Sequence, residues 1–203
     1  MKKFIPILAV LFSTSAAFAL NSKTDSRILK LPIKTGVLAN GLKVTLVQYP
    51  SPGVVAYQLP VHAGSRNEIE KGKSGFAHFF EHLMFRGTKK RSAAEFGALY
   101  ARLGCENNAW TSYDMTNYHG VVAKVYLKQI LEAESDRFAN LQFDEKQLRD
   151  EAGAVLGEYN KDVAQPEFLV EEKLMATAFE KHPYSHTTMG FRDDVLKFTE
   201  RYQ

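Results

Sequence analysis

Residues 74–88 read Ser-Gly-Phe-Ala-His-Phe-Phe-Glu-His-Leu-Met-Phe-Arg-Gly-Thr, and the chain changes there from strand pattern to helix pattern. The stretch contains the spacing His-x-x-Glu-His at His78, Glu81 and His82. On a helix, side chains four residues apart lie one above the other, so both imidazoles can reach one ion with Glu81 beside them. The alternative is a pair of hydrogen-bonded histidines in an aromatic core. We favour two metal ligands and a base on one helical face.

Strand patterns precede this stretch. Asn40-Gly41 lies between two alternating apolar runs within residues 37–47, which predicts a hairpin because both turn residues tolerate a positive φ. A third strand is expected from Val54 toward Val61. Pro60 lacks a backbone N–H, so this strand is expected to lie at an edge or to end there.

Helical patterns dominate after residue 74. The first helix is expected to end at Gly87, and Ser92 with Glu95 forms a capping box that opens a second helix, ending near Gly104. Strand-type residues return over 106–122, around a turn at Asp114. Further helices are expected at about 124–140, from Asp144, after Pro166 and near Asp193. Strands followed by helices predict an α+β fold, in which helices pack on one face of a mainly antiparallel mixed sheet.

The N-terminus is typical of an exported protein. A basic start, a short apolar run and the small-x-small site Ala17-Phe18-Ala19 predict a signal peptide over residues 1–19. The alternative is a membrane anchor, but the apolar run is far shorter than the roughly 20 residues that span a bilayer, so no stable membrane span is expected. Residues 20–35 are expected to form a polar N-terminal arm, and residues 36–203 the folded unit. The expected location is the bacterial periplasm or the exterior.

Charge and cysteine usage exclude other classes. Without Lys2 and Lys3, 24 basic residues stand against 23 acidic ones, so nucleic acid is not an expected partner. Cys105 is the only cysteine, which rules out an internal disulfide and leaves the fold to packing.

A zinc site needs at least three protein ligands, so two histidines are not enough. Glu151 and Glu158 lie seven residues apart on the helix expected after Asp144, and this spacing places them on one stripe. One carboxylate could bind the metal while the other supports a ligand, although a solvated helix face fits the same spacing. The other four histidines lack ligand spacing and are expected to be ordinary surface or loop residues: His62, His119, His182 and His186.

Several segments in this order resemble one known family. They are residues 64–68 (Gly-Ser-Arg-Asn-Glu), 75–88, 108–114 (Asn-Ala-Trp-Thr-Ser-Tyr-Asp) and 151–158. With the inverted His-x-x-Glu-His order, residues 36–203 resemble the N-terminal, metal-bearing domain of the pitrilysin/insulinase zinc metallopeptidases, the inverzincins, especially bacterial members akin to mitochondrial processing peptidase.

The resemblance assigns roles to particular residues. It implies that Glu158, which lies 76 residues after His82, is the third zinc ligand and that Glu151 supports the site. It also implies that Asn108 and Ala109 lie on an edge strand that receives the substrate peptide. With three ligands the fourth zinc position is left to water, and Glu81 is then expected to serve as general base in hydrolysing extended or unfolded peptides.

The resemblance also implies a missing part. Family members carry a second domain of similar fold, and this chain is expected to stop before the last strand of the first domain. The chain is therefore expected to need a second peptidase domain or a partner subunit, and the alternative function is a metal-binding, peptide-capturing half-enzyme that is inactive by itself. A purely structural zinc domain is a third alternative, but it would be expected to use several cysteine ligands.

Overall fold

The main sheet has three antiparallel strands in the order β4-β6-β5. The computed structural model describes residues 21–22 and 31–198, and this sheet is built from β4 (Val54–Val61), β5 (Glu106–Thr111) and β6 (Thr116–Ala123). Pro60 lies opposite Asn117 in the outer strand β4, so the edge position that proline predicts is confirmed. β5 is the other outer strand, so among the described strands its outer edge has no neighbour.

A second, smaller sheet holds the predicted hairpin. Its order is β1-β2-β3, with bounds β1 (Asn21–Ser22), β2 (Ile33–Val37) and β3 (Lys43–Val47), and all pairs are antiparallel. Gly41 has a φ of 87°, which is the reason that Asn-Gly suits this turn. The strands therefore divide between two sheets instead of one. β2 begins at Ile33, within the expected arm, whereas the predicted signal peptide over 1–19 lies outside the described residues.

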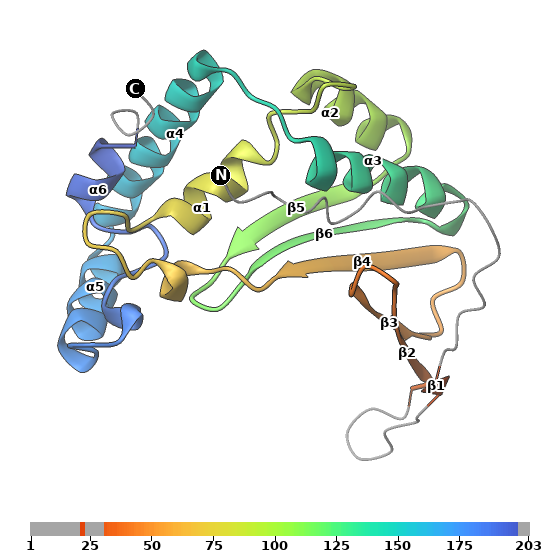
Figure 1. The fold of residues 1–203 in the computed structure, drawn as a ribbon, viewed down its shortest axis with the longest axis horizontal. Coiled ribbons are helices and arrows are strands. Elements are labelled where there is room, and N and C mark those ends of the chain that lie inside the picture. Colours follow the sequence, from red (N-terminus) through yellow and green to blue (C-terminus); the bar gives the residue numbers. More distant parts are fainter. Residues whose placement is uncertain (1–20, 23–30, 199–203) are drawn as a thin grey trace.

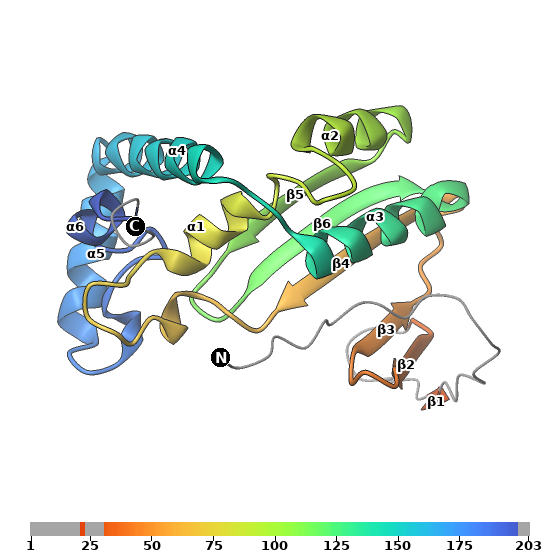
Figure 2. The ribbon, with the colours of Figure 1, turned by 45° about the horizontal axis from the view of Figure 1, so that its top comes forward.

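Three helices cover one face of the main sheet, as Figures 1 and 2 both show. They are α1 (Phe76–Leu83), α2 (Ala93–Arg102) and α3 (Leu127–Asn140). Beyond α1, at the end of the molecule away from the small sheet, lie α4 (Glu145–Val163), α5 (Pro166–Ala178) and α6 (Arg192–Leu196). Short 3-10 helices are η1 (Ser65–Asn67), η2 (Lys124–Tyr126) and η3 (Pro183–Ser185). The predicted α+β class is confirmed.

The helices bury two apolar clusters. One joins α1, α4 and α6 through Phe79, Leu83, Val155 and Val195, and the other joins the sheet to α2 and α3. In the second cluster, the hydroxyls of Tyr57 and Tyr100 both donate to the buried carboxylate of Glu134. No helix among the described residues is both long and apolar enough to cross a membrane.

Helix α1 is shorter than the sequence predicts. It ends at Leu83, and the backbone N–H groups of Phe85 and Arg86 donate to carbonyls three residues back, which tightens the last turn. Gly87 is therefore not the C-terminal glycine of this helix. It pairs with Ser92 in an isolated bridge, with a φ of 116°, where an added Cβ would approach the Arg91 carbonyl oxygen to 2.7 Å.

Candidate metal centre

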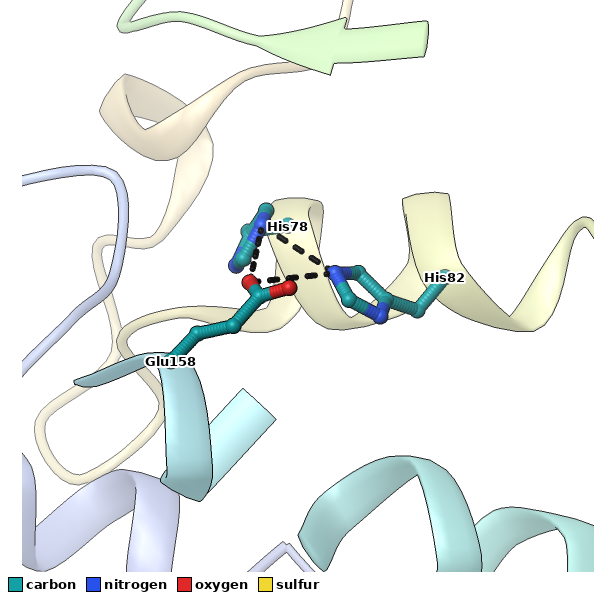
Figure 3. Close-up of side chains that lie close together, drawn as sticks. All are labelled: His78, His82 and Glu158. Carbon is teal, nitrogen blue, oxygen red and sulfur yellow. Dashed lines mark hydrogen bonds and ion pairs between the residues drawn. The ribbon is translucent and has the colours of Figure 1, made fainter. Parts of the chain in front are cut away.

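Helices α1 and α4 bring three side chains to one point (Figure 3). The Nε2 atoms of His78 and His82 are 3.3 Å apart, and Glu158 Oε2 lies 3.6 Å from the first and 3.5 Å from the second. These are the three side chains that can hold a metal ion among the described residues. Residues that adjoin the ligands on the two helices, Phe79 on α1 and Val155 on α4, are buried in one apolar cluster, so packing fixes how the two helices face each other.

The spacing of these atoms suits zinc. Tetrahedral ligands at about 2.0–2.2 Å from zinc are separated from one another by about 3.3–3.6 Å, the range of the three observed distances. The chemistry of the donors agrees, because two imidazole nitrogens and a carboxylate oxygen repel one another unless a proton or cation lies between them. The Glu158 side chain is 48% exposed, so this corner of the triangle is open to solvent.

Glu151 orients His82. The Nδ1–H of His82 donates to Glu151 Oε2 at 2.9 Å, which leaves the lone pair of Nε2 directed at the common point. The other oxygen of Glu151 pairs with Arg86. Burial lowers the pKa of His78 to about 4, with the neighbouring His82 adding to the effect. His78 is therefore neutral near pH 7, which is the state that binds a metal.

Glu81 points from α1 toward the end of strand β5. Its carboxylate accepts a hydrogen bond from the Thr111 hydroxyl. Thr111 also lies 3.3 Å from the hydroxyl of Thr116, whose own hydrogen is donated to the Ala63 carbonyl. The single hydrogen of Thr111 is thus available to Glu81. Burial raises the pKa of Glu81, and the bond from Thr111 opposes this shift.

Strand β5, which ends beside this carboxylate, pairs with β6 on one side and with no other described strand on its outer edge. Ala109 and Thr111 lie two residues apart and therefore share a face of the sheet. The Ala109 N–H donates to Asn108 Oδ1 at 2.9 Å, and this amide is directed away from strand β6. The edge position expected for Asn108 and Ala109 is thus observed among the described strands, with a backbone donor on its open side.

The sequence analysis assigned no individual role to three residues that support the site. Thr111 holds Glu81, Arg86 pairs with Glu151, and Glu68 accepts hydrogen bonds from the backbone at the start of α1. Their only signal was that they stand inside or next to the segments that carry the resemblance. His186 lies in the loop after η3, where it is buried, and its Nε2 lies 3.7 Å from Glu68.

An α+β domain with a His-x-x-Glu-His helix and a glutamate from a later helix defines a class, the zinc peptidases with the inverted motif. Residues 43–192 match the family model described as Insulinase (Peptidase family M16), and the chain belongs to this family. It is 35% identical over 164 residues to the zinc protease PqqE of Helicobacter pylori, covering 80% of this chain and 37% of that protein.

Two further relatives agree. A probable β subunit of mitochondrial-processing peptidase from Arabidopsis thaliana is 30% identical over 177 residues, covering 87% of this chain and 33% of the relative. The crystal structure of a protease from Helicobacter pylori superposes with a TM-score of 0.77 at 33% identity, covering 84% of this chain and 42% of that one. The chain thus spans well under half the length of the relatives it matches.

Proposed function

We propose that this chain is the metal-bearing part of a zinc endopeptidase that cleaves extended or unfolded peptides. The observation that carries the proposal is the meeting of His78, His82 and Glu158 at tetrahedral spacing. Membership of a peptidase family whose relatives are named zinc proteases supports it. Zinc is the metal of choice because two imidazoles and one carboxylate form a catalytic ligand set that leaves a fourth position open.

The remaining residues have distinct roles in this proposal. When bound, zinc lowers the pKa of a water molecule in its open position and polarises the carbonyl of the scissile peptide. Glu81 accepts a proton from that water and returns it to the departing amine, while Thr111 holds its carboxylate in place. Glu151 keeps the Nε2 lone pair of His82 directed at the metal.

The open edge of β5 supplies the substrate site of the proposal. A peptide that adds to this edge as an extra strand would be bound through backbone hydrogen bonds, with little demand on its sequence. The Ala109 N–H, which now donates to Asn108 Oδ1, would instead donate to a carbonyl of the bound peptide. Such a site favours extended or unfolded chains because a folded substrate has no free backbone to pair.

A half-enzyme is the second form of the proposal, and it is supported by the relative that is named as a subunit of mitochondrial-processing peptidase. Here the chain binds zinc and captures peptide, but turnover requires a second domain or a partner subunit.

The test compares zinc content and peptide hydrolysis, with and without chelator, for the chain alone and mixed with the remaining part of an insulinase-family protein. A purified chain that binds no zinc near a one-to-one ratio contradicts both forms, and activity only in the mixture selects the second.

Glu81→Gln separates the base from the ligands. The variant is expected to bind zinc as the wild type does, because no ligand is lost, while hydrolysis falls about 10²- to 10⁴-fold. Glu158→Gln is the comparison and is expected to lose zinc. Metal analysis and the hydrolysis rate of an unfolded peptide check both, in whichever of the two preparations is active. Zinc loss in Glu81→Gln would show that the two roles are misassigned.

We also propose export from the bacterial cytoplasm to the periplasm or exterior, on the basic start, apolar run and Ala17-Phe18-Ala19. N-terminal sequencing of the protein recovered from cell fractions is expected to begin at Leu20. Recovery of protein beginning at Met1 from the cytoplasm would contradict this.

A further inference from the structure

The first turn of α1 is held by a residue outside the helix. Its N-cap, Gly75, has a φ of 86° and no side chain with which to cap the helix. Glu68 takes over that task, because one carboxylate oxygen accepts the Gly75 N–H at 2.7 Å and the other accepts the Ala77 N–H at 2.7 Å. A helix as short as α1 does not persist in water by itself, so its geometry depends on such contacts.

The two histidines differ in what holds their rings. The Nδ1 of His82 donates to Glu151, whereas the Nδ1 of His78 is buried and has no hydrogen-bond partner among the residues that the structure describes. A metal-binding imidazole is normally oriented through its second nitrogen. His78 lacks this support and follows Ala77 directly in the first turn. Its position therefore depends on the backbone of that turn, which Glu68 bonds.

Glu68 is itself anchored to the main sheet. The N–H groups of Ser65 and Arg66 donate to the carbonyls of Ser112 and Tyr113, in the turn that connects β5 to β6. The approach is so close that a Cβ at Gly64 would lie 2.4 Å from the Ser112 oxygen. The segment 64–68 thus joins the strand that carries Thr111 to the turn that carries His78.

The C-terminal part of the described chain completes this anchor. Ser74 donates to Asp194 Oδ2 through its backbone N–H at 3.1 Å and through its hydroxyl at 2.6 Å. The backbones of Gly75 and Gly190 are in direct contact, because a Cβ on Gly190 would lie 2.6 Å from the Gly75 nitrogen. Glu68 is enclosed by these segments, with a side chain only 6% exposed.

We propose that Glu68 is a positioning residue for the metal centre: by bonding both Gly75 and Ala77 it fixes the first turn of α1 and so places His78 against His82 and Glu158. The inference rests on the proposed zinc site. It assigns a role to the segment Gly64-Ser65-Arg66-Asn67-Glu68, which contributes no ligand. The site is thereby supported twice, by the side-chain contact of Glu151 with His82 and by the bonds of Glu68 to the backbone just before His78.

Glu68→Gln tests this with little change of shape. Both carboxylate oxygens are used as acceptors, so an amide that replaces one oxygen with NH₂ can serve only one of the two N–H groups. Glu70→Gln is the matched control, since Glu70 lies in the same loop, is 68% exposed and pairs with Lys73.

Three measurements are made at a temperature where circular dichroism shows every variant folded. They are zinc affinity by competition with a coloured chelator, the visible spectrum of the cobalt(II) form, and amide hydrogen exchange of residues 76–79 without metal.

Glu68→Gln is expected to weaken zinc binding by about 10- to 100-fold, to alter the cobalt spectrum and to speed exchange in the first turn. Glu70→Gln is expected to stay within about twofold of the wild type. A folded Glu68→Gln variant that matches this control in all three measurements overturns the proposal.

If Glu68→Gln does not fold, the same measurements on Glu68→Asp test the proposal. Its shorter side chain keeps both oxygens but cannot reach both amides, so weaker zinc binding and faster exchange support the proposal, and wild-type values overturn it. If the wild type itself binds no zinc, the proposed function fails. The exchange rates of the metal-free variants then show separately whether Glu68 orders the first turn.

Discussion

Glu151 determines the orientation of His82 although it is not one of the three converging groups. It is 3% exposed, accepts from His82 Nδ1 at 2.9 Å and pairs with Arg86 through its other oxygen. A buried carboxylate of this kind is stable because both oxygens have partners. It would also make the Nε2 of His82 a better electron-pair donor to a metal ion.

Glu151→Gln is expected to weaken zinc binding about 10- to 100-fold, because the neutral amide is a poorer acceptor for the imidazole N–H. Glu145→Gln is the control on the same helix, where Glu145 is exposed and paired with Arg149. Competition with a chelator measures both. Equal affinities in the two variants would show that His82 does not need this carboxylate.

Strand β5 combines two tasks at the level of elements. Through Thr111 it holds Glu81, and through Ala109 it presents a backbone donor on its open side. Because both residues belong to one strand, a peptide paired with the edge would lie in a fixed register relative to the base. The proposed substrate site and the proposed base are thus positioned by the same backbone.

Ala109→Pro removes the N–H on the open edge and leaves the pairing with β6 intact. The affinity for an extended peptide is expected to fall about three- to tenfold, the range for one lost hydrogen bond, while zinc binding is unchanged. A titration with a labelled unfolded peptide measures the affinity. Unchanged peptide affinity in a folded, zinc-bound variant would place the substrate elsewhere.

Replacing glycine with alanine is expected to change the free energy of unfolding in opposite directions at two positions. Gly64→Ala places a Cβ 2.4 Å from the Ser112 carbonyl oxygen, so η1 must move from the β5–β6 turn at a cost of about 1–3 kcal/mol. Gly97→Ala, in the exposed interior of α2 with open space around it, is expected to stabilise by up to about 1 kcal/mol. Urea unfolding measures both free energies. Changes of the same sign would contradict the assigned packing.

At the scale of the molecule, the metal centre bridges two helices that are separate in the sequence. The contact between α1 and α4 rests on the cluster around Phe79, Leu83 and Val155 on one side and on the His78, His82 and Glu158 triangle on the other. A cation in the triangle would join both helices, so binding of metal and folding are expected to be linked.

Zinc is therefore expected to raise the melting temperature. At a free concentration one hundred times the dissociation constant, the gain is about 2.7 kcal/mol, which corresponds to about 5–10 °C for a domain of this size. Calorimetry with zinc and with chelator measures the shift, and a variant carrying both His78→Ala and His82→Ala is expected to show none. The same shift in that variant would mean that zinc binds elsewhere.

The sequence by itself determined the elements and the identity of the converging residues. Turn and cap chemistry is local, so Asn40-Gly41, the Ser92 and Glu95 box and the first-turn Pro166 marked boundaries that the structure confirms. The spacings of the histidines and glutamates are helical, so periodicity placed each pair on one face. The resemblance then singled out Glu158, whose Oε2 lies 3.6 Å and 3.5 Å from the two Nε2 atoms.

Only the tertiary structure decided how α1 begins and ends, how the strands divide between two sheets, and which groups hold Glu81 and His78. Thr111 is 30 residues from Glu81, and Glu68 meets Gly75 and Ala77 through a loop anchored on the β5–β6 turn. Such contacts join segments by backbone approach and burial, and no periodic pattern encodes them. A local sequence pattern specifies which face a residue occupies, whereas packing alone specifies what that face meets.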